Sequence, residues 1–180
     1  MSNTQTFQKW SIDPTHTEVQ LKVKHLVIST VTGSFNVFSG EVQTETDNFD
    51  GADVEFSIDA ASIDTNNPDR DAHLKSDDFF GVEKYSEIKF TNGKLKEVSG
   101  SDYKLTGNLT IKDVTKEVTL DVDYGGTVKD PWGNNRAGFE LEGKINRKDF
   151  GLTWNTVTEA GGVMVSDDVR LLINVQVVAA

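Results

Sequence analysis

The chain of 180 residues contains no cysteine, only three prolines and few basic side chains. The absence of cysteine excludes disulfides, thiolate metal ligands and thiol nucleophiles. Lys and Arg number 18 against 29 Asp and Glu, which gives a net charge of −11. No run of Lys or Arg could follow a phosphate backbone, so nucleic acid is not an expected partner, and the net charge opposes an anionic membrane. No apolar run is long enough to span a bilayer as a helix.

Motifs of the common catalytic sites are also absent. The sequence has no Gly-x-Ser-x-Gly elbow, no His-Glu-x-x-His, no phosphate-binding loop and no dinucleotide fingerprint. The acidic stretch 46–53 resembles a calcium loop only at Gly51, because Thr46 and Ser57 stand at the first and last ligand positions. We therefore interpret it as a hairpin turn. The sequence predicts no enzyme and no cofactor.

Nitrogen ligands for a metal ion are limited to three histidines. Their spacing lacks the i+2 or i+4 pairing typical of zinc sites, and a single histidine near a strand end is more often a hydrogen-bonded structural residue. The three are His16, His25 and His73. We therefore expect no metal site.

The length and composition predict one globular domain. We expect residues 1–9 to form an N-terminal tail and residues 10–180 to form the domain. Residues 1–6 lack the basic and apolar regions of a signal peptide, so the expected location is the cytoplasm. A periplasmic location is the alternative if this sequence is the processed form of a longer one.

Apolar and polar residues alternate with a period of two along most of the chain, which is typical of antiparallel strands with one buried and one solvated face. Short turns rich in Gly, Asp, Asn and Ser separate these segments. The segments are Thr17–Val27, Val31–Thr46, Asp53–Asp59, Ser86–Val98, Tyr103–Ile111, Val118–Tyr124, Phe139–Ile145 and Val169–Val177. Eight strands joined by hairpins predict an all-β, closed, antiparallel up-and-down barrel.

A single short helix is expected at residues 67–75. Asn67 suits the N-cap, Pro68 the first helical position, and Asp71 and Lys75 form an i,i+4 pair. Two glycines, Gly107 and Gly143, fall in the inward register of the strands. They either allow the strands to coil tightly or keep an apolar lumen open for a long ligand, and the sequence does not choose.

Several short motifs, in order along the chain from Trp10 to Val178, resemble those of the YceI-like family of bacterial, lipocalin-like, polyisoprenoid-binding proteins. They are Trp10-x-Ile12-Asp13-x-x-His16-Thr17, Lys24-His25-Leu26, Gly33-x-Phe35, Ile63-Asp64-Thr65, Arg70-Asp71-x-His73-Leu74, Asp78-Phe79-Phe80, Gly107-x-Leu109-Thr110 and Ile145-Asn146-Arg147-x-Asp149-Phe150-Gly151. The resemblance implies a lipocalin-like barrel with a helix against it and a polyisoprenoid, such as an isoprenoid quinone, or an acyl lipid inside. Many family members are exported, which this sequence as written does not indicate.

The resemblance also implies which residues handle the ligand. The tunnel lining is expected to be Val19, Leu21, Val23, Phe35, Phe56, Ile58, Phe90, Leu109, Phe139, Leu141, Leu171 and Ile173. Phe79, Phe80 and Phe150 would close or gate the barrel ends. The polar residues of the family motifs are Arg70, Asp71, His73, Arg147 and Asp149, and we interpret them as a hydrogen-bonded brace between the helix and its neighbouring loops, with contact to a ligand head group as the alternative.

The leading hypothesis is a non-catalytic protein that binds, stores or transports a polyisoprenoid or similar amphiphile. One alternative is an enzyme that uses the cluster of Arg70, Asp71, His73 and Arg147. Another is a stress-response interaction protein. The sequence leaves open the identity and chain length of the ligand, whether the lumen is open or packed, and whether the chain forms a homodimer.

Overall fold

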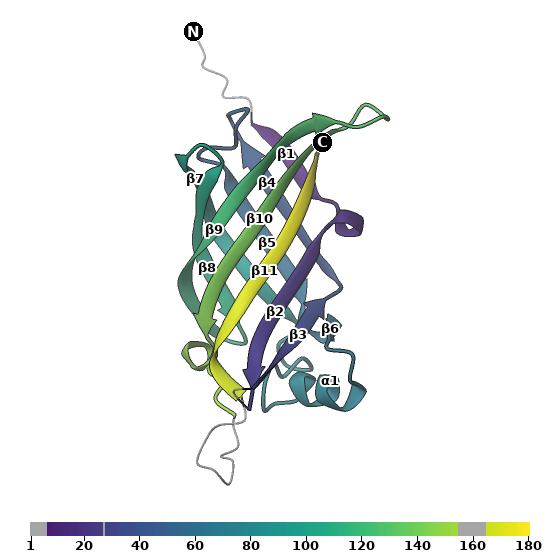
Figure 1. Cartoon of the computed structure of the whole chain (residues 1–180), viewed down its shortest axis with the longest axis vertical. Helices are drawn as coiled ribbons and strands as arrows, with labels where there is room; N and C mark the ends of the chain where they lie inside the picture. Colours follow the sequence, from purple (N-terminus) through teal and green to yellow (C-terminus); the bar gives the residue numbers. More distant parts are fainter. Residues whose placement is uncertain (1–6, 27, 155–164) are drawn as a thin grey trace.

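The computed structural model describes residues 7–26, 28–154 and 165–180. These residues form antiparallel strands, one α-helix and three short 3₁₀ turns (Figure 1). The strands are β1 (Gln8–Ile12), β2 (Glu18–His25), β3 (Ser29–Phe35), β4 (Phe38–Thr44), β5 (Asp53–Asp59), β6 (Ile63–Asp64), β7 (Glu87–Ser99), β8 (Asp102–Ile111), β9 (Val114–Lys129), β10 (Asn135–Asn146) and β11 (Val165–Ala179). The helix α1 is Pro68–Lys75, and the 3₁₀ turns are η1 (Pro14–His16), η2 (Ala60–Ser62) and η3 (Arg147–Phe150).

The strands close into a barrel because β11 pairs with β10 on one edge and with both β1 and β2 on the other. β1 and β2 are two halves of one barrel strand interrupted by η1. Two further barrel strands are interrupted in the same way: one consists of β3 and β4, the other of β5 and β6. β3 pairs with β2 and β6, whereas β4 pairs with β1 and β5. Counted in this way, eight barrel strands follow one another in chain order, which confirms the expected antiparallel up-and-down barrel.

The period-two pattern corresponds to the observed strands because most inward residues are apolar. On β11, Val169 and Val177 are buried in the barrel, whereas Arg170 between them in sequence is exposed. β1 is a strand that the sequence pattern does not predict, and its central Trp10 is 4% exposed. β1 begins at Gln8, and residues 1–6 of the expected tail lie outside the described residues.

Helix α1 confirms the expected helix, including its cap. The Asn67 side chain accepts a hydrogen bond from the backbone N–H of Arg70 at 3.1 Å, and Pro68 is the first helical residue. None of its residues is fully buried, and it lies across the lower end of the barrel beside β3 and β6 (Figure 1). β6 pairs with β3, and α1, which follows β6 in the chain, contacts it at this end of the barrel.

At the opposite end, an ionic cluster fastens the long β9–β10 hairpin to η1. The Arg136 guanidinium donates to Asp13 and Asp130, each at 2.7 Å. The Asp13 carboxylate also accepts from Thr15 and contacts His16 Nδ1 at 2.9 Å. The hydrogen bonds from Thr15, then those of His16 and Arg136, hold the pKa of Asp13 far below its usual range, and Arg136 lowers that of Asp130 to about 2.

We expect this cluster to contribute stability at neutral pH that disappears in acid. A carboxylate whose pKa is depressed by folding stabilises the fold above its unfolded pKa of about 3.9 and loses that contribution as pH falls through the folded value. Urea unfolding of Arg136→Gln should therefore give a lower midpoint than the original chain at pH 7, with the gap closing towards pH ~2. Lys9→Gln, which removes an exposed pair of Lys9 with Glu41 at 3.3 Å, should change little. A gap independent of pH would contradict the argument.

Candidate functional site

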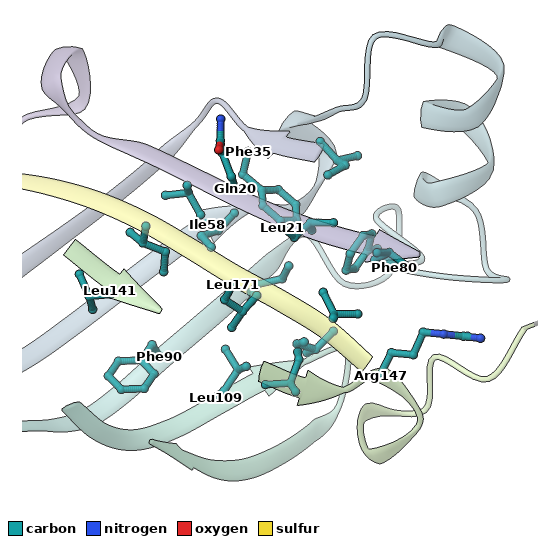
Figure 2. Close-up of a pocket in the computed structure, with 18 of the residues that line it drawn as sticks. Gln20, Leu21, Phe35, Ile58, Phe80, Phe90, Leu109, Leu141, Arg147 and Leu171 are labelled. Carbon is teal, nitrogen blue, oxygen red and sulfur yellow. The ribbon is translucent and has the colours of Figure 1, made fainter. Parts of the chain in front are cut away.

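The barrel encloses an elongated apolar cavity of about 570 Å³. Its walls are inward-facing side chains of most of the barrel strands, with Leu21, Leu109, Leu141 and Leu171 around its middle (Figure 2). All twelve residues expected to line a tunnel lie along it: Val19, Leu21, Val23, Phe35, Phe56, Ile58, Phe90, Leu109, Phe139, Leu141, Leu171 and Ile173. The geometry therefore places them where a ligand inside the barrel would contact them.

Several of these inward-facing side chains are only half-buried. Leu21, Leu109 and Leu171 point into the barrel, yet each keeps part of its surface accessible. Inward residues of a packed barrel would instead be almost fully covered. The exposed apolar surface faces the cavity, so a ligand there would remove it from water.

The upper end of the barrel is closed by an aromatic cluster, here called the aromatic plug, made of Trp10, Phe49, Tyr103 and Tyr124. Phe49 comes from the β4–β5 turn, is completely buried, and lies 5.0 Å from the Trp10 ring, centroid to centroid. The Tyr103 hydroxyl donates to the carbonyl of Asn48 at 2.6 Å, which fixes this turn over the barrel. The turn connects two paired strands, β4 and β5, which confirms the predicted hairpin, but its polar sequence does not indicate that Phe49 closes the end.

Polar lining residues gather at the other end and form what we call the polar rim. They come from the end of β2, the segment around α1, and η3: Lys24, His25, Asn67, Asp69, Arg70, His73 and Arg147. Lys24 and Asp69 are exposed, so the cavity reaches the surface here. An apolar interior with one polar end suits an amphiphile whose chain lies inside and whose head stays at the rim.

Of the three aromatic residues expected at the barrel ends, Phe79 and Phe80 line the cavity beside α1. Phe80 packs edge-on against Phe35 of β3 with ring centroids 5.8 Å apart. Phe150 is 2% exposed and belongs to the hydrophobic cluster of this end without lining the cavity. Phe150 is therefore part of the packed core of this end, whereas Phe79 and Phe80 border the cavity.

The inward-facing glycines do not keep the lumen open. A Cβ at Gly107 would lie 2.5 Å from Cζ of Phe90, and one at Gly143 would lie 2.1 Å from Cδ2 of Leu120. The space beside each glycine is thus filled by a neighbouring side chain. The structure supports the packing interpretation of these glycines, because the cavity lies alongside Phe90 and Leu120 and not at the glycines themselves.

The polar residues of the family motifs do not form one cluster. Arg70 donates from Nε to the Thr65 hydroxyl at 2.8 Å and from Nη2 to the Thr65 carbonyl at 2.7 Å. Asp71 accepts from the backbone N–H of Thr65 at 2.9 Å and from its hydroxyl at 2.5 Å. Both residues therefore tie the start of α1 to the segment after β6.

His73 makes a separate set of contacts at the end of α1. Its Nε2 lies 2.9 Å from a carboxylate oxygen of Asp78, and its ring packs edge-on against Phe79 and Trp154, with centroids 5.1 and 4.6 Å away. The contact with Trp154 joins α1 to the segment after η3.

Arg147 is 3% exposed, and among the described residues its hydrogen bonds go to main-chain carbonyls, with the carboxylate of Asp167 further away at 3.9 Å. Burial lowers the pKa of its guanidinium, and Asp167 partly offsets this. The acceptors are the carbonyls of Ser166 at 2.9 Å, Leu152 at 2.6 Å, Trp154 at 2.8 Å and Val165 at 3.3 Å. Arg147 therefore joins η3 to the start of β11, while Asp149 is exposed on η3.

No set of three His, Asp or Glu side chains in the described part of the chain is arranged to hold a metal ion. Within residues 7–26, 28–154 and 165–180, no helix has the length and apolar character needed to cross a membrane.

Three known proteins show how this barrel relates to others. A UPF0312 protein of Pectobacterium atrosepticum is 41% identical over 168 residues, which cover 93% of this chain and 84% of that protein. The crystal structure of Burkholderia cenocepacia BcnA has a TM-score of 0.79 at 21% identity and covers 92% of this chain and 98% of its own. A polyisoprenoid binding domain from Saccharophagus degradans has a TM-score of 0.67 at 17% identity, with 95% and 98% covered.

The two structures show that the barrel fold is shared, and the Pectobacterium protein shows relationship in sequence along almost the whole chain. The family model described as YceI-like domain matches residues 10–177, which include every strand of the barrel except the start of β1 and the end of β11. This chain therefore belongs to the YceI-like domain family.

Proposed function

We propose that the protein binds one long-chain isoprenoid, or an amphiphile of similar shape, in the barrel and stores or carries it without chemical conversion. The observation that carries the proposal is the apolar cavity of about 570 Å³, which runs from the polar rim to Phe139, whose ring packs against Phe49 of the aromatic plug. Membership of the YceI-like domain family and the fold shared with a polyisoprenoid binding domain support a binding role.

The cavity volume suits a chain of moderate length. A methylene group is close in size to a water molecule, which takes about 30 Å³ in the liquid, so 570 Å³ holds roughly 20 such groups. Each buried methylene contributes ~0.8 kcal/mol, so about ten of them supply roughly 8 kcal/mol before the cost of association. A twenty-carbon prenyl chain therefore fits the described cavity and needs no charged contact along its length.

A binding role explains the polar residues better than catalysis does. Arg70 and Asp71 are engaged by Thr65, His73 faces Asp78, and Arg147 is engaged by backbone carbonyls. A catalytic constellation requires groups that converge on one reacting atom, and here each group is held by a different local partner. The same side chains form a stable polar border around an apolar opening.

Native mass spectrometry with geranylgeraniol tests the proposal. The protein, delipidated with organic solvent and refolded, should gain the mass of one geranylgeraniol molecule, and the same protein purified from its own source should release a stoichiometric isoprenoid or acyl lipid on extraction. Geraniol, with half the chain, should bind far more weakly because it leaves about ten carbon positions of the cavity unfilled. Failure of both geranylgeraniol and palmitic acid to bind would contradict the proposal.

A further inference from the structure

The connection between β2 and β3 is unusual for a hairpin turn. Leu26 is 37% exposed and Ile28 is 85% exposed, and the residue between them in the sequence is Val27. Hairpin turns normally use Gly, Asn, Asp or Ser, because these residues tolerate the backbone and face water. Leu26 has φ +53°, a conformation that glycine or asparagine adopts more readily. Folding alone does not account for apolar residues in this turn. We call Leu26 and Ile28 the apolar tip.

The apolar tip lies beside the opening of the cavity. Lys24 and His25, which directly precede Leu26, belong to the polar rim. His25 also pairs with Val165 at the start of β11, so the tip and the opening share the lower end of the barrel, where α1 lies (Figure 1). An apolar chain that leaves the cavity at this end would pass close to the tip.

Three basic side chains stand side by side on the outer face of the barrel near this tip. The strand register places Lys144 of β10 opposite Arg170 of β11, and Arg170 opposite Lys22 of β2, and we call these three the cationic row. Like charges on directly opposed positions destabilise a sheet. Among the described residues, neither Lys22 nor Arg170 has a carboxylate within ion-pair distance, and Lys144 has only Asp168 at 3.7 Å.

The charge pattern on this face also has a direction. One pair of positions further from the tip, Glu142 and Gln20 flank Leu172, so the cationic row ends here. The net charge of −11 opposes a strongly anionic surface, but here the three basic side chains of the cationic row outnumber the carboxylates of Asp167 and Asp168, which precede Arg170 on β11. Two exposed acidic residues, Asp69 of α1 and Asp78 after it, keep that side of the opening away from phosphates.

We propose that the lower end of the barrel docks on a phospholipid bilayer, with the apolar tip inserted among the head groups and the cationic row facing the lipid phosphates. Insertion removes Leu26 and Ile28 from water, and the charged row sets the orientation. Docking in this way brings the opening of the cavity to the bilayer. Docking deepens the proposed function, because it would let an isoprenoid pass from the bilayer into the cavity. That role in loading the ligand rests on the proposed function.

Vesicle co-sedimentation tests the docking. Vesicles of phosphatidylcholine mixed with phosphatidylglycerol should bind the full chain, and the double variant Leu26→Ser/Ile28→Ser should bind at least about tenfold more weakly. Lys22→Gln/Arg170→Gln should weaken binding to these vesicles and reduce its dependence on salt. The matched control is Val98→Ser, which removes an apolar side chain that is 61% exposed at the opposite end of the barrel and should leave binding unchanged.

Uptake of geranylgeraniol added from ethanol, measured by native mass spectrometry, separates the two proposals. Normal uptake by the tip variant, together with slower transfer of geranylgeraniol from vesicles, is the expected result. Equal vesicle binding by the tip variant and the original chain, or no vesicle binding by either, overturns the docking but leaves the proposed function standing. Vesicle binding that depends on the tip in a chain that takes up no lipid supports the docking and overturns the carrier role.

Discussion

Leu171→Trp is expected to abolish uptake of geranylgeraniol, while Leu172→Trp on the same strand leaves it unchanged. Leu171 points into the cavity, opposite Leu21 on one side and Gly143 on the other. Indole adds about six heavy atoms to the leucine side chain, and these occupy space that ligand carbons would fill. At ~0.8 kcal/mol for each carbon position, the ligand loses roughly 5 kcal/mol of binding free energy, which raises its Kd on the order of a thousandfold.

Leu172 supplies the matched control because its side chain lies on the outer face of β11, between Glu142 and Gln20. Both variants should unfold at a temperature close to that of the original chain, because Leu171 is only half-buried and the space beside it is open. Native mass spectrometry gives the occupancy, and thermal unfolding confirms that each barrel is intact. Undiminished uptake by a folded Leu171→Trp protein would show that the ligand does not occupy the cavity.

Much of the fold follows from local sequence patterns, because each barrel strand carries its own alternation of apolar and polar residues. The lining residues are predictable for the same reason. Once Val169 and Leu171 of β11 are known to face inward, every second residue along that strand faces inward too. The helix was identified by its cap at Asn67 and by Pro68, both of which act within a few residues. These features depend on short-range physics, which a single sequence contains.

Features that depend on strand register could not be predicted. Lys144, Arg170 and Lys22 are far apart in the chain and become neighbours only through the pairing of β10, β11 and β2. Phe49 lies in a polar turn, and nothing local shows that the turn folds over Trp10. The short strand β1 could not be predicted either, because five residues are too few to show a clear alternation. Its pairing with β4 and β11 shows that it is a strand.

The glycines show why a pattern can support a wrong mechanism. An absent side chain in the inward register suggests empty space, but neighbouring residues are free to fill it. At Gly107 the Phe90 ring does so, with its Cζ 2.5 Å from where a Cβ would stand. Whether a glycine opens a lumen or admits a neighbour depends on cross-strand geometry. The open space instead lies where the half-buried leucines do not pack against one another. The amino-acid composition does not show where that happens.

Arg147→Leu is expected to destabilise the fold by about 4 kcal/mol and lower the Tm by about 10 °C. The guanidinium is almost fully buried and donates to carbonyls in two segments, including Leu152 at 2.6 Å and Ser166 at 2.9 Å. Its removal takes charged donors from buried carbonyls, at about 1–3 kcal/mol for each group that water cannot reach. Arg147→Lys should cost about half as much, because one ammonium nitrogen cannot reach all the acceptors that the guanidinium binds through its three nitrogens, at different edges of its plane.

The same two variants decide between a structural brace and a contact with the ligand head group. A brace predicts that Arg147→Leu and Arg147→Lys take up geranylgeraniol and geranylgeranyl phosphate as the original chain does, when each is measured well below its own Tm. Contact with an anionic head predicts a selective loss for the phosphate, with the alcohol unaffected. The four carbonyls already satisfy most of the guanidinium donors, so little hydrogen-bonding capacity is left for a ligand and the brace is the expected outcome.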